Sequence, residues 1–197
     1  MMDTSGQYAL AYALTTTAGL RGFLTLFSVS LAAHFHWIHP AASFAWLGHD
    51  STMIVLGVFS ALEFIGDKVP VVDHALHAVS FAVRPVAGAI LVGGTVHTDN
   101  TGSLYSMMAL GALNSLLVHG SSAAARAAST ATTAGLANPG MSFGEDAAAV
   151  GGIVLAFMHP YVAGIVAAIF VIVLLLVARA TWVIVRNRHR EPALRRS

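Results

Sequence analysis

Residues 161–185 read YVAGIVAAIFVIVLLLVARATWVIV, and this stretch decides the class of protein. Its core, from Gly164 to Ala178, is an unbroken apolar run. A helix needs about 20 consecutive apolar residues to cross the hydrocarbon core of a bilayer. The stretch therefore predicts a transmembrane helix, the clearest one in the chain.

The composition of the whole chain agrees with a membrane location. Of its 197 residues, 56% are hydrophobic and only 10% are charged, whereas soluble domains carry roughly a quarter charged residues. So little charge cannot cover a water-facing surface, and lipid does not require one. Five further apolar runs precede the stretch 161–185 in the chain. They lie at 8–37, 51–66, 75–97, 104–124 and 143–158. We predict an all-α, polytopic transmembrane helical bundle of about six spans, with the lipid bilayer as its main partner.

Three places in this bundle favour broken or half helices. The first apolar run, 8–37, is too long for one span, and in it Gly19 and Gly22 flank Arg21. Glycines at such a position favour a break or an interfacial half-helix. Two further breaks are predicted in the polar connections 66–74 and 135–145.

The basic residues predict the topology. Six of the ten Lys and Arg residues fall in the last 19 positions, and such a cluster after an apolar helix is typical of a cytoplasmic anchor. We predict one transmembrane domain over 1–185 and a basic cytoplasmic tail over 186–197. A tail of this kind needs no nucleic acid as a partner. Six spans would place both termini in the cytoplasm and leave outside three connections without Lys or Arg, namely 38–50, 98–103 and 158–161.

A short internal similarity suggests a repeat. The sequence TTAGL at 16–20 recurs at 132–136, and each copy precedes two apolar runs that turn at a His-Pro pair. Because both hairpins would run in the same sense, the similarity predicts a weak parallel repeat of 16–66 and 132–185. The alternative is chance similarity in a chain rich in Ala, Gly and Thr.

A polar block begins at the end of the second apolar run. Glu63 and Asp67 are four residues apart and would share one face of a helix. Two carboxylates at the end of a span can bind a cation or pass protons. In the alternative interpretation the block is a cytoplasmic turn, in which the acids pair with Lys68 and Asp73 caps the next helix.

The third and fourth apolar runs carry polar side chains with identical spacing. At positions i, i+4, i+7 and i+11, and so on one helical face, stand Asp73, His77, Ser80 and Arg84, and then Ser115, His119, Ser122 and Arg126. An arginine within a span is costly if it faces lipid, so Arg84 should face protein or water. We predict that the two stripes face each other and line one polar cavity. The alternatives are a buried pair of Arg84 with an acid such as Glu63 or Asp67, and an ordinary small-residue packing face on the fourth run.

Two acids stand at the start of the fifth run. Ser142 and Glu145 match a capping box, and Asp146 suits the positive end of a helix dipole. Structure alone would explain both acids. Alternatively, a re-entrant helix start at this place would offer backbone donors to an anion.

The sequence predicts no cofactor and assigns no metal. Four of its ten histidines cluster near the first outer turn, where they would be able to gather Zn²⁺ or Cu²⁺. They form no helical His-x-x-x-His pair with an adjacent acid. A phosphate-binding loop, a Gly-x-Ser-x-Gly elbow and a His-Glu-x-x-His motif are all missing from the sequence.

Several stretches carry a family resemblance. They are LRGF at 20–23, FAWL at 44–47, LEFIGDKVPVVDHALHAV at 62–79, RPVAGA at 84–89, and the segment from Asn138 to Asp146. Together they resemble an uncharacterised bacterial family of integral membrane proteins, the domain of unknown function with the number 4126, over about residues 18 to 180. The resemblance implies a multi-spanning fold in the bacterial inner membrane. It implies no activity.

Three classes of function remain, and a small transporter or channel for an ion or polar solute ranks first. A structural or accessory membrane protein with internal salt bridges ranks second. An enzyme acting on a lipid or phosphorylated substrate ranks last, because no catalytic motif is present. Small-residue faces would also allow a homo-oligomer. The predicted polar path consists of Glu63, Asp67, Lys68, Asp73, His77, Arg84, His119, Arg126, Glu145 and Asp146.

Overall fold

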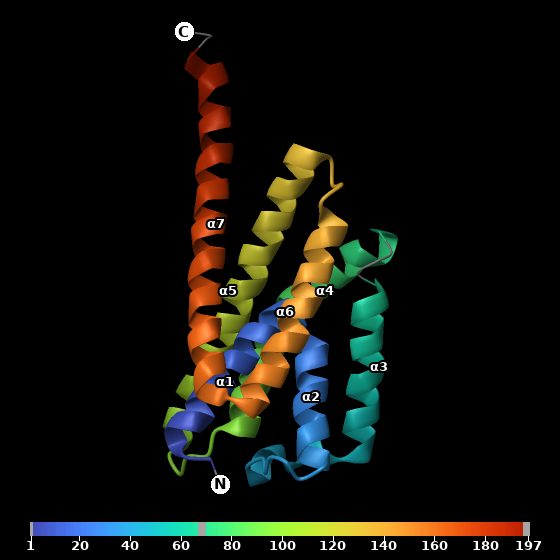
Figure 1. Cartoon of the computed structure of the whole chain (residues 1–197), viewed down its shortest axis with the longest axis vertical. Helices are drawn as coiled ribbons and strands as arrows, with labels where there is room; N and C mark the ends of the chain where they lie inside the picture. Colours follow the sequence, from blue (N-terminus) through green and yellow to red (C-terminus); the bar gives the residue numbers. More distant parts are fainter. Residues whose placement is uncertain (1, 67–69, 195–197) are drawn as a thin grey trace.

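The computed structural model describes residues 2–66 and 70–194, except for the side chains of 70–78, 181 and 184–194. Within these ranges the chain forms helices and turns and no strand. The helices are α1 (Thr4–Leu20), α2 (Gly22–His34), the 3₁₀-helix η1 (Ala42–Gly48), α3 (Asp50–Gly66), α4 (Pro70–Thr95), α5 (Thr101–Thr133), α6 (Asn138–Met158) and α7 (Pro160–Leu194). The predicted all-α bundle is confirmed (Figure 1).

Apolar helices long enough to cross a membrane identify a membrane protein. Among the described residues, α5, α6 and the part of α7 from Pro160 to Ala180 meet this condition. The pair of η1 and α3 adds a fourth span if the two are counted together, although they are bent by 64°. The count of six spans stays a prediction. Helix α7 continues without interruption to Leu194, so the predicted tail begins inside this helix.

Helix α1 lies at the centre of the bundle. It contacts α2, α4, α5, α6 and α7, and its residues from Leu10 to Leu20 are almost all buried. A helix that is apolar on all sides is stable only inside a protein or a membrane. The hydroxyl groups of Thr15, Thr16 and Thr17 donate to carbonyl oxygens of the preceding turn at 2.8–3.0 Å, which allows them to be buried.

Helices α1 and α2 form a hairpin whose apex is buried. Arg21, between them, has extended backbone angles (φ −140°, ψ 91°), and α2 then returns toward the end at which α1 began (Figure 1). The 13 residues of α2 span roughly 20 Å at the rise of an α-helix. The apex therefore lies roughly 20 Å along α2 from the end at which that helix finishes. The predicted break near Gly19 and Gly22 is confirmed.

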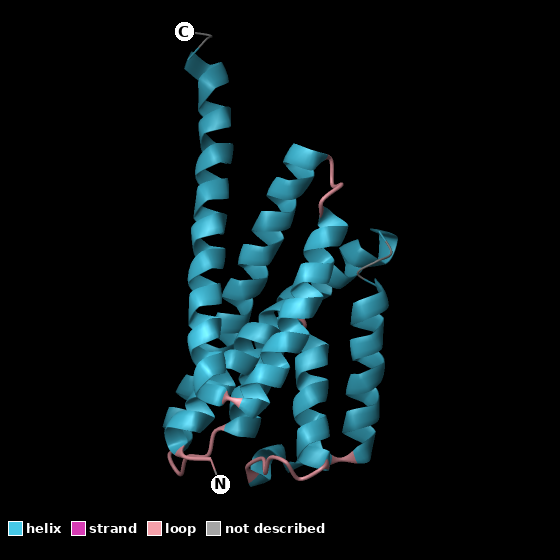
Figure 2. Ribbon diagram, viewed as in Figure 1, coloured by secondary structure: helices cyan, strands magenta, loops and turns pink. Residues whose placement is uncertain are grey.

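The N-terminus lies at one end of the bundle, together with two helix connections. Asp3 accepts a hydrogen bond from the hydroxyl group of Tyr161, at the start of α7, at 2.6–2.7 Å. The side chain of Gln7 accepts one at 2.8 Å from the backbone N–H of His97, between α4 and α5. Figure 2 shows most of the described loops at this end and the α5–α6 connection toward the opposite end. The C-terminus lies at the opposite end (Figure 1).

The N-terminus and the end of α7 lie at opposite ends of the molecule (Figure 1). The location of both termini on the cytoplasmic side of the membrane stays a prediction. The prediction treated the first apolar run as one crossing. Because α1 and α2 fold back on each other, the run begins and ends at the same end of the molecule. The helices from α3 to α7 then alternate in direction, which brings the C-terminus to the other end (Figure 1).

The connection between α5 and α6 corrects two further predictions. Ala134 and Gly135 have positive φ angles of 52° and 85°, which end α5 in a left-handed turn. Helix α6 starts at Asn138 with a proline in its first turn and runs unbroken to Met158, so 138–145 is no half-helix. Ser142 and Glu145 lie inside this helix and form no capping box, because the helix begins before them.

The directions of the helices bear on the predicted repeat. Helices α5, α6 and α7 follow one another in the same senses as α1, α2 and α3 (Figure 1). The TTAGL segment stands at the end of α1 and again at the end of α5. The repeat itself stays a prediction, as does the domain boundary at residue 185.

Candidate functional site

The carboxylate of Glu63 caps the start of α2. Its two oxygens accept hydrogen bonds from the backbone N–H groups of Gly22, Phe23 and Leu24 at 3.0, 3.1 and 3.3 Å. The first N–H groups of a helix have no partner within the helix, and the residue before α2, Arg21, makes no side-chain cap. An acid from α3 therefore satisfies these donors, and its charge interacts favourably with the positive end of the helix dipole.

Arg84 approaches the same place from α4. Its Nη1 donates a hydrogen bond to the carbonyl oxygen of Gly19, one of the last residues of α1. Its Nη2 lies 4.0 Å from Oε1 of Glu63. A Cβ built on Gly22 would lie 3.4 Å from Cγ of Arg84, so the arginine stem packs over the first residue of α2. Arg84 thus bridges the end of α1 and the start of α2.

Arg21 ties the apex of the hairpin to α6. Its Nε lies 2.6 Å from Oδ1 of Asp146, and its Nη2 donates to Oγ of Ser142 at 3.2 Å. The side chains of Arg21, Glu63, Arg84 and Asp146 are all less than a tenth exposed. We call these four residues the central cluster. It contains two arginines and two carboxylates around one helix break.

A third ion pair lies between α5 and α6. Both Nε and Nη2 of Arg126 donate to the carboxylate of Glu145, with Nε at 3.3 Å from Oε1. The hydroxyl group of Ser122 donates to the same carboxylate. The two charged side chains are 12% and 14% exposed, so this outer pair is nearer to solvent than the central cluster. Two turns before Arg126 on α5, His119 is fully buried and packs edge-on against Phe81 of α4 at a ring distance of 4.5 Å.

Comparison with known proteins gives a family and no activity. Residues 8–180 match the family described as Domain of unknown function (DUF4126). The chain belongs to this family. The resemblance that the sequence motifs carried is thereby confirmed. Among curated proteins and among solved structures, none matches this member of the family significantly.

Of the predicted path residues, six have described side chains, and five of these belong to the ion pairs. The central cluster contains Glu63, Arg84 and Asp146, and the outer pair consists of Arg126 and Glu145. His119 packs against Phe81 of α4 instead. The predicted burial of Arg84 is confirmed, and so is its pairing with Glu63. Four predicted residues lie outside the described side chains: Asp67, Lys68, Asp73 and His77.

The described parts of the two polar stripes do not face each other across a cavity. Arg84 of α4 points to α1 and α3 instead. On α5, Ser115 donates to the carbonyl oxygen of Thr15 in α1 at 2.7 Å, and Ser122 and Arg126 bind Glu145 of α6. Central α1 lies against both α4 and α5, so their polar residues find partners on the other helices.

The sequence interpretation missed Arg21 and Ser142 as site residues. From the sequence, Arg21 was interpreted only as the position of a helix break between two glycines. Ser142 was interpreted only as part of a capping box. The signal for Arg21 was present, because an ionisable residue inside an apolar run is a candidate functional residue wherever it occurs. The backbone donors of α2 had no such signal, since their acceptor stands 41 residues away.

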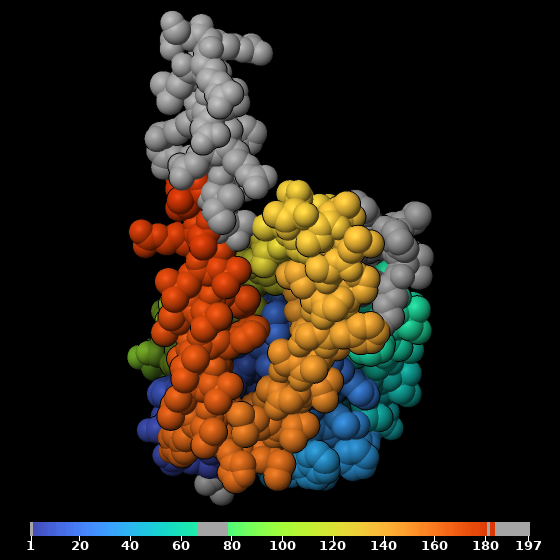
Figure 3. Space-filling view, turned by 45° about the horizontal axis from the view of Figure 1, so that its top comes forward, coloured from blue at the N-terminus to red at the C-terminus, as the bar shows by residue number. Residues whose placement is uncertain are grey.

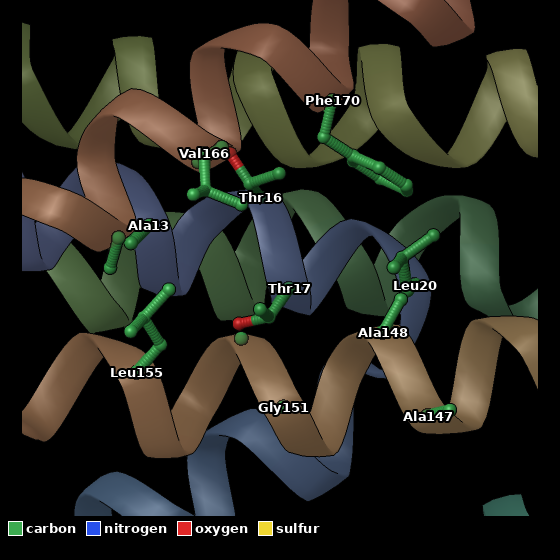
Figure 4. A pocket seen from close by; sticks show the side chains of 13 residues that line it. Ala13, Thr16, Thr17, Leu20, Ala147, Ala148, Gly151, Leu155, Val166 and Phe170 are labelled. Carbon is green, nitrogen blue, oxygen red and sulfur yellow. The ribbon is translucent and has the colours of Figure 1, made fainter.

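Two apolar grooves flank α1. One, of about 260 Å³, lies between α1, α6 and α7, and Figure 4 shows Thr16 and Thr17 of α1 facing Gly151 of α6 and Val166 of α7. These two outer helices stand beside each other on one face of the molecule (Figure 3). The other groove, of about 610 Å³, lies between α1, α4 and α5. Neither groove is lined by a charged residue, so both suit acyl chains better than a polar solute.

Metal binding finds no support in the described part of the chain. There, no three His, Cys, Asp or Glu side chains are grouped so as to hold an ion. The outer histidines have other neighbours. Nδ1 of His34 lies 3.2 Å from Oδ1 of Asp50, and the rings of His36 and His39 stack at 6.4 Å.

Proposed function

We propose that this protein transports an ion or small polar solute across the bacterial inner membrane, with its C-terminal end in the cytoplasm. The observation that carries the proposal is the buried hairpin apex, where a helix break lies beside four ionisable side chains. Many membrane transporters bind their substrates at discontinuous helices near the middle of the bilayer. Irregular backbone at that depth is tolerated where protein or a cavity surrounds it.

The cost of the buried charges supports a functional role. Removing two ions from water is expensive, and replacing a buried ion pair by apolar residues is often neutral or stabilising. A bundle that needed only to be stable would therefore not require Arg21, Glu63, Arg84 and Asp146 in its interior. Ionisable groups within a membrane protein commonly mark the route of an ion, a proton or a substrate.

The outer pair extends the proposed route. Glu145 is the chain neighbour of Asp146, so the outer pair adjoins the central cluster through consecutive residues of α6. Arg126 and Glu145 are also more exposed than the central residues. A solute that exchanges partners between these pairs would move from the hairpin apex toward the C-terminal end. Asp67, Lys68, Asp73 and His77 stay predicted members of this route.

A structural role is the second candidate, because every charge in the cluster has a partner within the protein. Glu63 binds three backbone N–H groups, Arg84 binds Gly19, and Arg21 binds Asp146. In this alternative the cluster only holds the α1–α2 hairpin against α3, α4 and α6. Removal of one charge would then destabilise the protein, and the wild type itself would transport none of the ions tested.

A flux assay with one conservative variant separates the two candidates. Wild-type protein is reconstituted in vesicles that contain reporters for protons, potassium and chloride, and the decay of each imposed gradient is compared with that in empty vesicles. We expect wild type to dissipate at least one gradient, and Glu63→Gln to do so about tenfold or more slowly. Asp99→Asn, in the exposed connection between α4 and α5, is the matched control and should behave like wild type.

The unfolding midpoint of each variant completes the assay. Transport is supported if Glu63→Gln loses flux while its midpoint stays near that of wild type. A wild type without flux for any of these ions, combined with a large fall in the midpoint of Glu63→Gln, would favour the structural role.

A further inference from the structure

We infer that the start of α2, together with Arg84, is a binding site for a small planar monovalent anion, which takes the place of the Glu63 carboxylate. This inference rests on the proposed function and names its substrate class. In the present structure Glu63 occupies the site as a tethered ligand. Its carboxylate has the size and charge of formate, and nitrate has a similar planar shape.

The backbone supplies one half of the site. Three consecutive N–H groups, those of Gly22, Phe23 and Leu24, converge on the two oxygens of the carboxylate at 3.0–3.3 Å. Such a helix start binds anions in general, because its free donors and its dipole both favour negative charge. Gly22, which lacks a side chain, keeps the first of these donors open to Arg84 at its side.

Arg84 supplies the other half, and Glu63 satisfies it incompletely. The residue is 6% exposed. Its Nη2 stands 4.0 Å from Oε1 of Glu63, which is beyond hydrogen-bond distance. Its Nε–H has no hydrogen-bond partner among the described residues. A buried N–H without a partner is unfavourable. An untethered anion would be able to approach both the helix start and this guanidinium group, whereas Glu63 is held by its own helix.

The positive charges around Glu63 favour the binding of an anion when the Glu63 carboxylate is protonated. Helix α3 packs against α2, α4 and η1. In their described parts, the ionisable groups near Glu63 are Arg84 from α4 and Arg21 from the α1–α2 break, while η1 brings none. Asp146 neutralises Arg21. Glu145, which also attracts Arg84, is held by Arg126. Among the described residues, protonation of Glu63 therefore leaves one positive charge in excess, beside Arg84.

The two ligands compete for the same donors, which couples the anion to a proton. When the anion enters, Glu63 takes up one proton from water and leaves the helix start as a neutral carboxylic acid. The anion then accepts the hydrogen bonds from the backbone and from Arg84, and the net charge of the site stays the same. Anion binding should consequently be tighter at low pH.

A thermal-unfolding titration tests the inference in wild type and Glu63→Gln. The probes are sodium nitrate and sodium formate, and sodium gluconate, which is too bulky for a buried site, is the control at equal ionic strength. We expect nitrate and formate to raise the unfolding midpoint of wild type at about pH 5 and to have little effect at about pH 8. Glu63→Gln should respond at both pH values, with an apparent Kd for nitrate at the higher pH about tenfold or more below that of wild type. Asp50→Asn, outside the cluster, should titrate like wild type.

Equal responses to nitrate and gluconate, in wild type and Glu63→Gln alike, would overturn the inference. If Glu63→Gln does not fold, the wild-type comparison between the two pH values decides alone. The flux assay, repeated with imposed nitrate and formate gradients, separates this result from the proposed function. Nitrate binding without flux of nitrate, formate, protons, potassium or chloride supports the anion site and contradicts transport. Potassium or proton flux without an anion response supports transport and overturns the anion site.

Discussion

Arg21 has two separate roles in the fold. Its backbone leaves the helical conformation and its carbonyl oxygen accepts hydrogen bonds from Thr25 at 2.8 and 3.1 Å, which starts α2. Its side chain binds Asp146 and Ser142 of α6. Loss of one partner from a buried ion pair is costly, because the remaining charge stays buried without compensation.

We predict that Arg21→Gln lowers the free energy of unfolding by about 3–5 kcal/mol. The double variant Arg21→Gln/Asp146→Asn should recover part of this loss, since it leaves no unpaired charge. A denaturant titration of the two single variants and the double variant gives the coupling energy of the pair. Additive effects of the two substitutions would show that the side chains do not depend on each other.

At the residue scale, the sequence predicts which charged side chains are buried better than it predicts their ion-pair partners. The position of Arg84 within an apolar run predicts that it avoids lipid, and the structure agrees. The sequence does not determine which acid, Glu63 or Asp67, is the ion-pair partner of Arg84. The pairs of Arg21 with Asp146 and of Arg126 with Glu145 depend on how α6 packs, and no spacing along the chain shows that.

Helices α4 and α5 approach each other closely through two glycines. A Cβ built on Gly111 would lie 2.7 Å from the carbonyl oxygen of Gly88 and 2.5 Å from a methyl group of Val92. Small residues commonly allow such contacts between helices in membranes. Farther along α5, a Cβ on Gly120 would meet no atom within 4 Å.

We predict opposite effects for alanine at these two positions of α5. Gly111→Ala forces α4 and α5 apart and should lower the free energy of unfolding by about 1–3 kcal/mol. Gly120→Ala gains helix propensity without a clash and should be neutral or stabilising by up to about 1 kcal/mol. Unfolding midpoints of the two variants in one detergent provide the comparison. A loss at Gly120 equal to that at Gly111 would contradict the role assigned to the contact.

At the element scale, hydrophobic runs and glycines predict helices well and their ends less well. The break at Arg21 is where the flanking glycines place it. The start of α6 is not where the capping box places it, because the Asn138-Pro139 pair already begins a helix one turn earlier. A motif that fits a helix start carries no information on whether a stronger signal precedes it.

The whole molecule has its two termini at opposite ends (Figure 1). The basic residues with described positions agree with one orientation of this arrangement. The N-terminal segment and the connections at its end contain no Lys or Arg, whereas the basic segment after Ala178 lies at the C-terminal end. In the orientation that we propose, the α1–α2 hairpin enters the membrane from the outer side.

Single cysteines test this topology directly, because the chain has none of its own. We predict that a membrane-impermeant maleimide labels Ser5→Cys and Asp99→Cys in intact spheroplasts. Ala131→Cys, near the end of α5, should react only after the membrane is opened. All three positions are exposed. Joint labelling of Ser5→Cys and Ala131→Cys on one side would support a first run that crosses the membrane once.

The sequence by itself determined the class of protein, the helices, the break at Arg21 and the presence of charges that must avoid lipid. These properties depend on the composition and on side chains a few residues apart, which act through helix geometry and the low polarity of the bilayer. Only the tertiary structure decided that the first run is a hairpin and that Glu63 caps α2 from 41 residues away. It also decided that Arg21 reaches Ser142 across 121 residues. Such contacts arise from the packing of α1 among the other helices, because buried donors and charges bind whichever partners the packing brings within reach.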